Sequence, residues 1–135
     1  MAVLVDSNVI LDVATGDPRW AGWSSNALAQ AADANVLVVN PIIFAEVSIG
    51  FDRVEDLEVV LPADAYRRDP LPYEAAFLAG KAFLAYRRRG GTRSAPLPDF
   101  YIGAHAAVAG YELLTRDAAR FRTYFPRIKL IAPPK

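Results

Sequence analysis

Short, mostly apolar runs alternate with helical patterns along this chain, and no other feature constrains its fold as much. The runs are AVLV (2–5), VLVV (36–39), ELL (112–114) and IKLIA (128–132). Continuous apolar runs of this length are typical of parallel strands that are covered on both faces. Helices between such strands predict an α/β fold, a three-layer α/β/α sandwich with a mainly parallel sheet.

The segments between these runs carry helical signals, namely apolar residues at helical spacing, and proline and glycine at the expected ends. We predict helices over 7–15, 19–34, 41–51, 54–61, 73–89 and 99–110, and a short helix opened by Asp117. The segments 65–72 and 90–98 are rich in turn residues, which predicts loops. We expect residues 1–135 to form a single domain, because this length suits one hydrophobic core.

Composition narrows the class of protein. The chain is 53% apolar or aromatic and contains no cysteine, so disulfides and thiolate metal sites are excluded. It has no apolar run of about 18 residues, and its first residues carry an acid where a signal peptide carries a base. We therefore expect a cytoplasmic protein without a membrane span.

Charge is unevenly distributed, although the formal net charge is zero. Residues 1–65 contain ten acids and two bases, whereas residues 66–135 contain five acids and thirteen bases, so the halves carry −8 and +8. A separate basic region suits a protein that handles a polyanion.

Four acids occupy positions that need an explanation. Asp6 and Asp117 follow predicted strands, Asp99 begins a predicted helix, and Glu46 lies in the apolar segment PIIFAEVSIGF. Asp6, Asp99 and Asp117 could each cap a helix, and Glu46 could face solvent. Alternatively, all four carboxylates meet at the carboxyl edge of the sheet around a divalent cation. Oxygen ligands favour Mg²⁺ or Mn²⁺, which suit phosphodiester hydrolysis.

The motifs VLVDSNVILD, PIIFAEV, LPDFYIGAHA and LLTRDAARF resemble, in this order, the motifs of PIN-domain nucleases, and more narrowly those of VapC toxins. The resemblance implies a Mg²⁺- or Mn²⁺-dependent endoribonuclease toxin of a toxin–antitoxin pair. Asp6, Glu46, Asp99 and Asp117 match the family's acidic quartet. Asp6, Asp99 and Asp117 would bind metal, and Glu46 would orient or deprotonate water. Supporting polar positions are matched by Ser7, Asn8 and Thr115.

The resemblance also implies partners and products. It implies an RNA substrate, with tRNA as the leading candidate. The expected products carry a 5′-phosphate and a 3′-hydroxyl. A VapB-like antitoxin and a homodimer are expected as well. One departure is that Ala119 and Arg120 stand where many relatives carry a further acid. We therefore expect a second ion to arrive only with the substrate phosphate.

Basic side chains near the last two acids are candidates for RNA contact, namely Arg87, Arg88, Arg89 and Arg93 in YRRRGGTRS, and Arg116 beside Asp117. Structural roles are expected for His105 and for the aromatic residues Trp20, Trp23, Phe44 and Phe51. Two other interpretations remain open. One is a Mg²⁺-binding phosphoacceptor receiver domain, which would need a lysine just after a late strand. The other is a catalytically silent PIN-like binding module.

Overall fold

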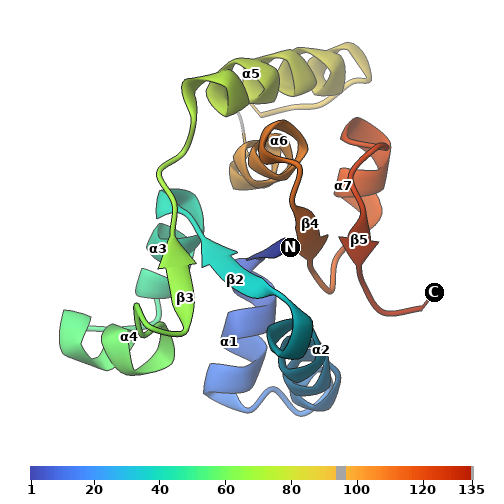
Figure 1. The fold of residues 1–135 in the computed structure, drawn as a ribbon. Coiled ribbons are helices and arrows are strands. Elements are labelled where there is room, and N and C mark those ends of the chain that lie inside the picture. The colour runs from blue at the N-terminus through green and yellow to red at the C-terminus, as the bar shows by residue number, and fades with distance from the viewer. Residues whose placement is uncertain (94–96, 135) are drawn as a thin grey trace.

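The computed structural model describes residues 1–93 and 97–134. Helices cover both faces of a central sheet, as predicted (Figure 1). The strands formed by these residues are β1 (Ala2–Val5), β2 (Val36–Val39), β3 (Tyr66–Arg68), β4 (Glu112–Leu114) and β5 (Leu130–Ile131). Their helices are α1 (Ser7–Thr15), α2 (Ala21–Ala34), α3 (Pro41–Ser48), α4 (Val54–Val60), α5 (Tyr73–Arg88), α6 (Pro98–Ala109) and α7 (Ala119–Tyr124).

The strand order is β3-β2-β1-β4-β5, and all four pairings are parallel. The chain builds outward from β1 to β3, then crosses back to β4 on the other side of β1. This reversal leaves a crevice outside the carboxyl ends of β1 and β4, where open parallel sheets bind their ligands. Val5 pairs with Leu114, so the next residues along the two strands, Asp6 and Thr115, lie side by side.

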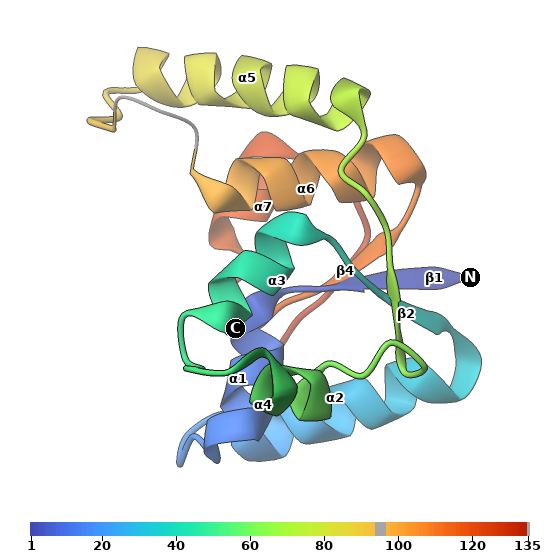
Figure 2. The same cartoon turned by 90° about the vertical axis from the view of Figure 1, so that its left-hand side faces the viewer.

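The sheet is buried between two helical layers. Helices α1 and α2 lie below it and α5, α6 and α7 above it in Figure 1. Helix α3 contacts both α1 and α6, and in Figure 2 it lies between them. Val3, Leu4 and Val5 are completely buried, which explains why β1 is apolar along its whole length.

One predicted loop contains a strand. Residues 65–72 include β3, which pairs with β2 along one edge of the sheet. The sequence YRR has no apolar run, because only Tyr66 is buried and the two arginines that follow are exposed. Backbone pairing to β2, rather than side-chain burial, holds this edge strand in place.

Several predicted boundaries also shift. The last strand covers only Leu130–Ile131, and the segment 99–110 becomes a helix that begins one residue earlier, at Pro98. The short helix after β4 begins at Ala119 rather than at Asp117. Residues 94–96 of the predicted loop 90–98 lie outside the described residues.

The four aromatic residues expected in the core lie at its margin. Trp23, Phe44 and Phe51 are half-buried against the buried cluster, and Trp20 is also half-buried. Within residues 1–93 and 97–134, no helix has the length and apolar character needed to span a bilayer.

Candidate active site

Asp6 lies directly after β1, at the carboxyl edge of the sheet. Its side chain is only 3% exposed, and its backbone N–H donates to the carbonyl of Leu114 across 2.9 Å. The hydroxyl of Thr115 donates to Oδ2 of Asp6 at 2.8 Å. Burial raises the pKa of Asp6 to about 7, and repulsion by Asp99 and Glu46 adds to this, while the Thr115 bond opposes it.

Ser7, the first residue of α1, links Asp6 to Glu46 on α3. Its hydroxyl donates to Oε1 of Glu46 at 2.9 Å and lies 3.5 Å from Oδ1 of Asp6. Glu46 is half-buried, and desolvation together with the charge of Asp99 raises its pKa. The carboxylate of Glu46 is therefore fixed by Ser7 near the crevice, and Glu46 is not the solvated residue of an amphipathic helix.

Asp99 reaches the same edge from the first turn of α6. Burial is the main cause of its raised pKa, and the negative charge of Asp117 acts in the same direction. Arg120 of α7 opposes this shift, because its Nη1 lies 3.3 Å from Oδ2 of Asp99. One of the two residues that depart from the family pattern thus contacts the acid directly.

Asp117 lies two residues beyond Thr115 and is exposed. Its backbone N–H donates to the hydroxyl oxygen of Thr115 at 3.1 Å. The side-chain amide of Asn8 donates to the same oxygen at 3.4 Å, and its carbonyl accepts from the backbone N–H of Arg116. Thr115 and Asn8 therefore hold the loop that carries Asp117 against α1.

Capping does not explain the three aspartates. Asp6 is at the N-cap position of α1, but its side chain accepts no capping hydrogen bond. Asp99 lies inside α6, whose N-cap position is Leu97, and Asp117 precedes Ala118, which occupies the N-cap position of α7. The side chain of Asp17, which the sequence did not single out, instead accepts the N–H groups of Arg19 and Trp20.

The acids interact electrostatically with their neighbours, but they do not surround a common point as the ligands of a metal ion do. Asp6, Glu46 and Asp99 repel one another, and Asp99 also feels Asp117. Among the described residues, no three His, Asp or Glu side chains are grouped closely enough to bind one metal ion as they stand. Repulsion between unscreened carboxylates and the Arg120 ion pair both favour this open arrangement.

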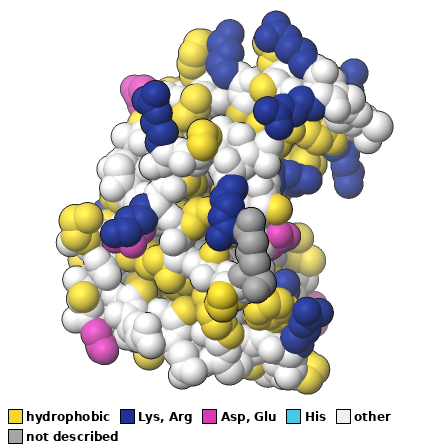
Figure 3. Space-filling model, turned by 90° about the vertical axis from the view of Figure 1, so that its right-hand side faces the viewer, with side chains coloured by type: hydrophobic (Ala, Val, Ile, Leu, Met, Phe, Trp, Pro, Cys, Tyr) yellow, Lys and Arg dark blue, Asp and Glu magenta, His cyan; other side chains and the backbone are white. Residues whose placement is uncertain are grey.

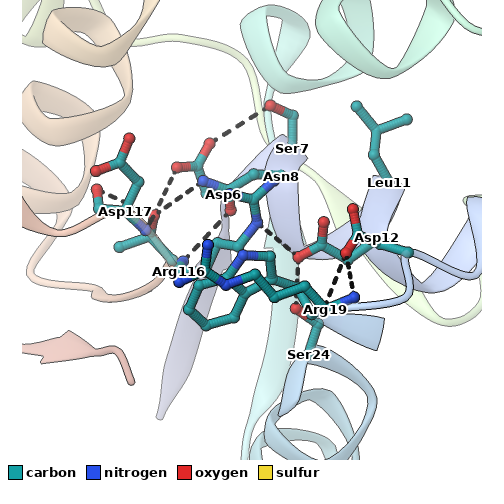
Figure 4. A network of polar contacts seen from close by, with 12 residues as sticks. Asp6, Ser7, Asn8, Leu11, Asp12, Arg19, Ser24, Arg116 and Asp117 are labelled. Carbon is teal, nitrogen blue, oxygen red and sulfur yellow. Dashed lines mark hydrogen bonds and ion pairs between the residues drawn. The ribbon is translucent and has the colours of Figure 1, made fainter. Parts of the chain in front are cut away.

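Arg116 turns away from Asp117 (Figure 4). Its Nε donates to Oδ2 of Asp12 at 2.8 Å, and the same oxygen accepts from the hydroxyl of Ser24 at 2.8 Å. The guanidinium also lies 5.5 Å from the ring centroid of Trp20. Arg116 thus joins the loop after β4 to the buried Asp12 of α1, so the proposed RNA contact would require it to leave this partner.

The arginines at the end of α5 differ in their surroundings. Arg87 donates to the carbonyl of Arg93 at 2.6 Å, which closes the turn after the helix. Arg89 lies over the ring of Tyr124, while Arg88 and Arg93 are exposed. Basic side chains gather over this upper part of the molecule, above a hollow in the surface (Figure 3). Ser94 of the motif YRRRGGTRS lies outside the described residues.

His105 is buried, and its Nδ1 accepts a hydrogen bond from the amide of Asn40 at 2.9 Å. Burial lowers its pKa, which keeps the ring neutral. The same Asn40 caps α3 by accepting the N–H of Ile43. These contacts give His105 the structural role that was expected.

The sequence model of the PIN-domain family matches residues 3–125. The chain belongs to the PIN-domain family. The predicted resemblance and fold class are therefore confirmed. No curated protein sequence is significantly similar to this PIN domain.

Solved structures share its fold. VapBC2 from Rickettsia felis, bound to a DNA fragment from its promoter, has a TM-score of 0.76 and 18% identity, covering 99% of this chain and 100% of that chain. VapBC-1 from nontypeable Haemophilus influenzae has a TM-score of 0.74 and 17% identity, and DNA-bound VapBC from Salmonella typhimurium has 0.73 and 17%. Both likenesses cover 98% of this PIN domain and 98% of the other chain.

The receiver-domain interpretation is wrong. Receiver domains have the strand order 2-1-3-4-5, whereas β1 of this PIN domain lies between β2 and β4. Lys129 precedes β5 instead of following a late strand, so it cannot reach the carboxyl edge where the acids lie.

Proposed function

We propose that this PIN domain is a Mg²⁺- or Mn²⁺-dependent endoribonuclease and the toxin of a VapBC-like toxin–antitoxin pair. The observation that carries the proposal is the buried Asp6 carboxylate, whose pKa is raised to about 7 beside Glu46 and Asp99. Burying mutually repelling carboxylates costs free energy, and folded proteins tolerate that cost mainly at functional sites. A divalent cation between them would offset both the desolvation and the repulsion.

The donor atoms fit a hard cation. Asp6, Asp99 and Asp117 offer carboxylate oxygens only, which suits Mg²⁺ or Mn²⁺. These three residues would hold the ion, which would acidify a bound water and neutralise charge on the phosphate. Asp99 would have to leave Arg120 to do so. A second ion would arrive with the substrate phosphate.

Glu46 is the proposed base. Its Oε1 accepts the hydrogen bond from Ser7, which fixes the carboxylate, and Oε2 is the oxygen proposed to take a proton. The raised pKa makes that oxygen a better proton acceptor. Water deprotonated at this oxygen attacks phosphorus, and the bond from phosphorus to the 3′ oxygen breaks. The leaving 3′ oxygen takes a proton from a solvent water, so a 5′-phosphate and a 3′-hydroxyl result, and Glu46 then releases its proton to solvent. Ser7, Asn8 and Thr115 act by holding Glu46, Asp6 and the Asp117 loop.

The proposed partners follow from the relatives. The three solved structures compared above are VapBC assemblies, two of them with DNA, which supports a VapB-like antitoxin as partner. We propose tRNA as the first substrate to test, a homodimer as the working form and the cytoplasm as its location. Arg87, Arg88, Arg89, Arg93 and Arg116 are the proposed RNA contacts.

Cleavage of RNA by the purified protein tests the proposal. Total RNA and bulk tRNA are incubated with wild type, Asp99→Asn and Glu46→Gln, with Mn²⁺ or Mg²⁺ and with chelator. We expect metal-dependent cutting at a few sites that both substitutions abolish, while Asp52→Asn, which changes an exposed acid between α3 and α4, cuts like wild type. Equal cutting by all four proteins, or cutting that persists in chelator, would reject the mechanism. No cutting by the wild type would favour the silent binding module.

A further inference from the structure

A pocket lies beside Asp99 and Asp117, on the side of α5 and α7. Its volume is about 400 Å³, and its lining includes Asp99 and Asp117 together with Tyr86, Arg120 and Tyr124. Two of the acids in the crevice thus also form one wall of this pocket. The other walls are aromatic and basic, a combination that the proposed hydrolysis does not use.

The aromatic wall is packed against other rings. The ring of Tyr124 packs edge-on against the buried Phe100, with 5.3 Å between ring centroids and 89° between planes, and lies 6.4 Å from the ring of Tyr86. Tyr86 is held in turn by stacking on Phe83, and its hydroxyl accepts the backbone N–H of Thr92 at 3.3 Å. A nucleobase that packs against fixed rings costs them little conformational entropy.

The backbone that follows α5 packs closely against the ring of Tyr86. A side chain at Gly91 would place its Cβ only 2.2 Å from Cε2 of Tyr86. Only glycine therefore lets the turn pass this close. Residues 91 and 92 are thereby held against the wall of the pocket, and the basic end of α5 lies beside them.

Two arginines supply positive charge. Arg89 lies 5.5 Å from the ring centroid of Tyr124, and Arg120 lies 5.8 Å from that of Phe100. The Arg120–Asp99 ion pair has one contact of 3.3 Å, and its side chains are 39% and 33% exposed. A pair this open to solvent contributes at most about 1 kcal/mol, so Arg120 can exchange Asp99 for another anion at little cost.

We propose that this pocket is a subsite for one unpaired nucleotide of single-stranded RNA, next to the bond that is cut. The nucleobase packs against Tyr124 and Tyr86, and Arg120 leaves Asp99 to contact the adjoining phosphate. Base stacking on aromatic side chains and arginine contacts to phosphate are the usual means of holding single strands. The inference rests on the proposed function, because it requires RNA as the substrate, but it concerns binding and not hydrolysis.

Binding without metal tests the subsite. The probe is fluorescein-labelled decauridylate in EDTA at low salt, and its affinity is measured by fluorescence anisotropy. Ala119→Trp fills the pocket from an exposed lining position, and Arg120→Gln removes the phosphate contact. We expect each to weaken binding by roughly five- to twenty-fold, the size of one stacking or charged contact. Arg122→Gln removes an exposed arginine from the same helix outside the pocket and is expected to bind like wild type.

A second probe separates base from phosphate. A decamer of the same charge with abasic sugars is expected to bind wild type about as weakly as decauridylate binds Ala119→Trp. Ala119→Trp is expected to leave the affinity for the abasic decamer unchanged. Equal affinity of wild type, Ala119→Trp and Arg120→Gln for decauridylate would overturn the subsite, as would no measurable binding by wild type. Loss of metal-dependent cleavage is a separate result, which would overturn the nuclease instead.

Discussion

The hydroxyl of Thr115 donates a 2.8 Å hydrogen bond to the carboxylate of Asp6, across the crevice between the carboxyl ends of β4 and β1. The two residues are 109 positions apart in the sequence. Their bond is the largest influence that lowers the pKa of Asp6 against the effect of burial. It therefore keeps part of the Asp6 population charged near neutral pH, as a metal ligand must be.

Replacing Thr115 by valine tests this bond, because valine has almost the same shape and no hydroxyl. The pKa of Asp6 should rise further, so the acidic limb of the pH–rate profile should move up by about one unit. RNA cleavage rates between pH 5 and 9 measure the shift. Thr15→Val, which removes an exposed hydroxyl from the end of α1, should leave the profile unchanged. A profile that stays in place would show that Thr115 does not set the charge of Asp6.

Stability of the metal-free protein should fall as pH rises from about 4 to 8. Asp6 has a folded-state pKa raised from 3.8 to about 7, so its protonated form stabilises the fold at low pH and that contribution is lost as pH rises through 7. Between pH 5 and pH 8 the loss is on the order of 2–3 kcal/mol. Urea unfolding in EDTA at pH 5 and 8 measures it.

Asp6→Asn provides the comparison for this pH dependence. It should flatten the dependence and be more stable than wild type at pH 8, whereas Asp33→Asn on the surface of α2 should behave like wild type. Glu46 and Asp99 act in the same direction. Asp17 and Asp69, with lowered pKa values, lose their contribution only at lower pH. Burial lowers the pKa of His105, so this residue opposes part of the fall below pH 6.5. A wild-type protein as stable at pH 8 as at pH 5 would contradict the burial of a charged Asp6.

Mn²⁺ should raise the melting temperature at pH 8. A ten-fold excess of the ion over its Kd adds about 1.4 kcal/mol, or roughly 3–6 °C for a chain of this size. The effect should shrink at pH 5, where protons compete for the carboxylates. Differential scanning fluorimetry measures the shift. Asp99→Asn should lose it and Asp52→Asn should keep it, so an equal shift in both variants would place the ion elsewhere.

The ion pair between Asp12 and Arg116 should contribute to stability. Asp12 is 2% exposed, and Arg116 is its only cationic partner among the described residues. A double-mutant cycle with Asp12→Asn and Arg116→Gln should give a coupling energy of about 1–2 kcal/mol. The cycle from Arg53→Gln and Glu55→Gln, an exposed pair, should give less than about 0.5 kcal/mol. Similar values for the two cycles would show that Arg116 is free to contact RNA.

Gly103 of α6 should not tolerate alanine. An added Cβ would lie 2.4 Å from Cδ2 of Phe125 and 3.1 Å from Cδ1 of Phe121, and both rings are buried. We expect Gly103→Ala to destabilise the fold by roughly 1–3 kcal/mol through overpacking. Gly80→Ala on the exposed side of α5 meets no atom within 4 Å and should stabilise by up to about 1 kcal/mol. Chemical denaturation of both variants compares the two effects, and equal changes would contradict the close packing of α6 on Phe125.

Local patterns in the sequence were sufficient to predict three of the strands. The runs at 2–5, 36–39 and 112–114 could be predicted as strands because parallel strands that are covered on both faces are mostly apolar. Asp6 and Asp117 could be placed at the carboxyl edge because each follows such a run. β3 could not be predicted from the sequence, because an edge strand that exposes two of its three side chains has no apolar run.

The sequence by itself determined the fold class and the family, because these depend on residue types in a fixed order, and it supplied the four acids of the proposed site. The tertiary structure decided which partner each charged group meets. Arg116 contacts Asp12 rather than Asp117, and Arg120 contacts Asp99, across 104 and 21 residues of sequence. Such pairs depend on how helices pack on the sheet, because a long side chain is directed by its surroundings and not by its neighbours along the chain.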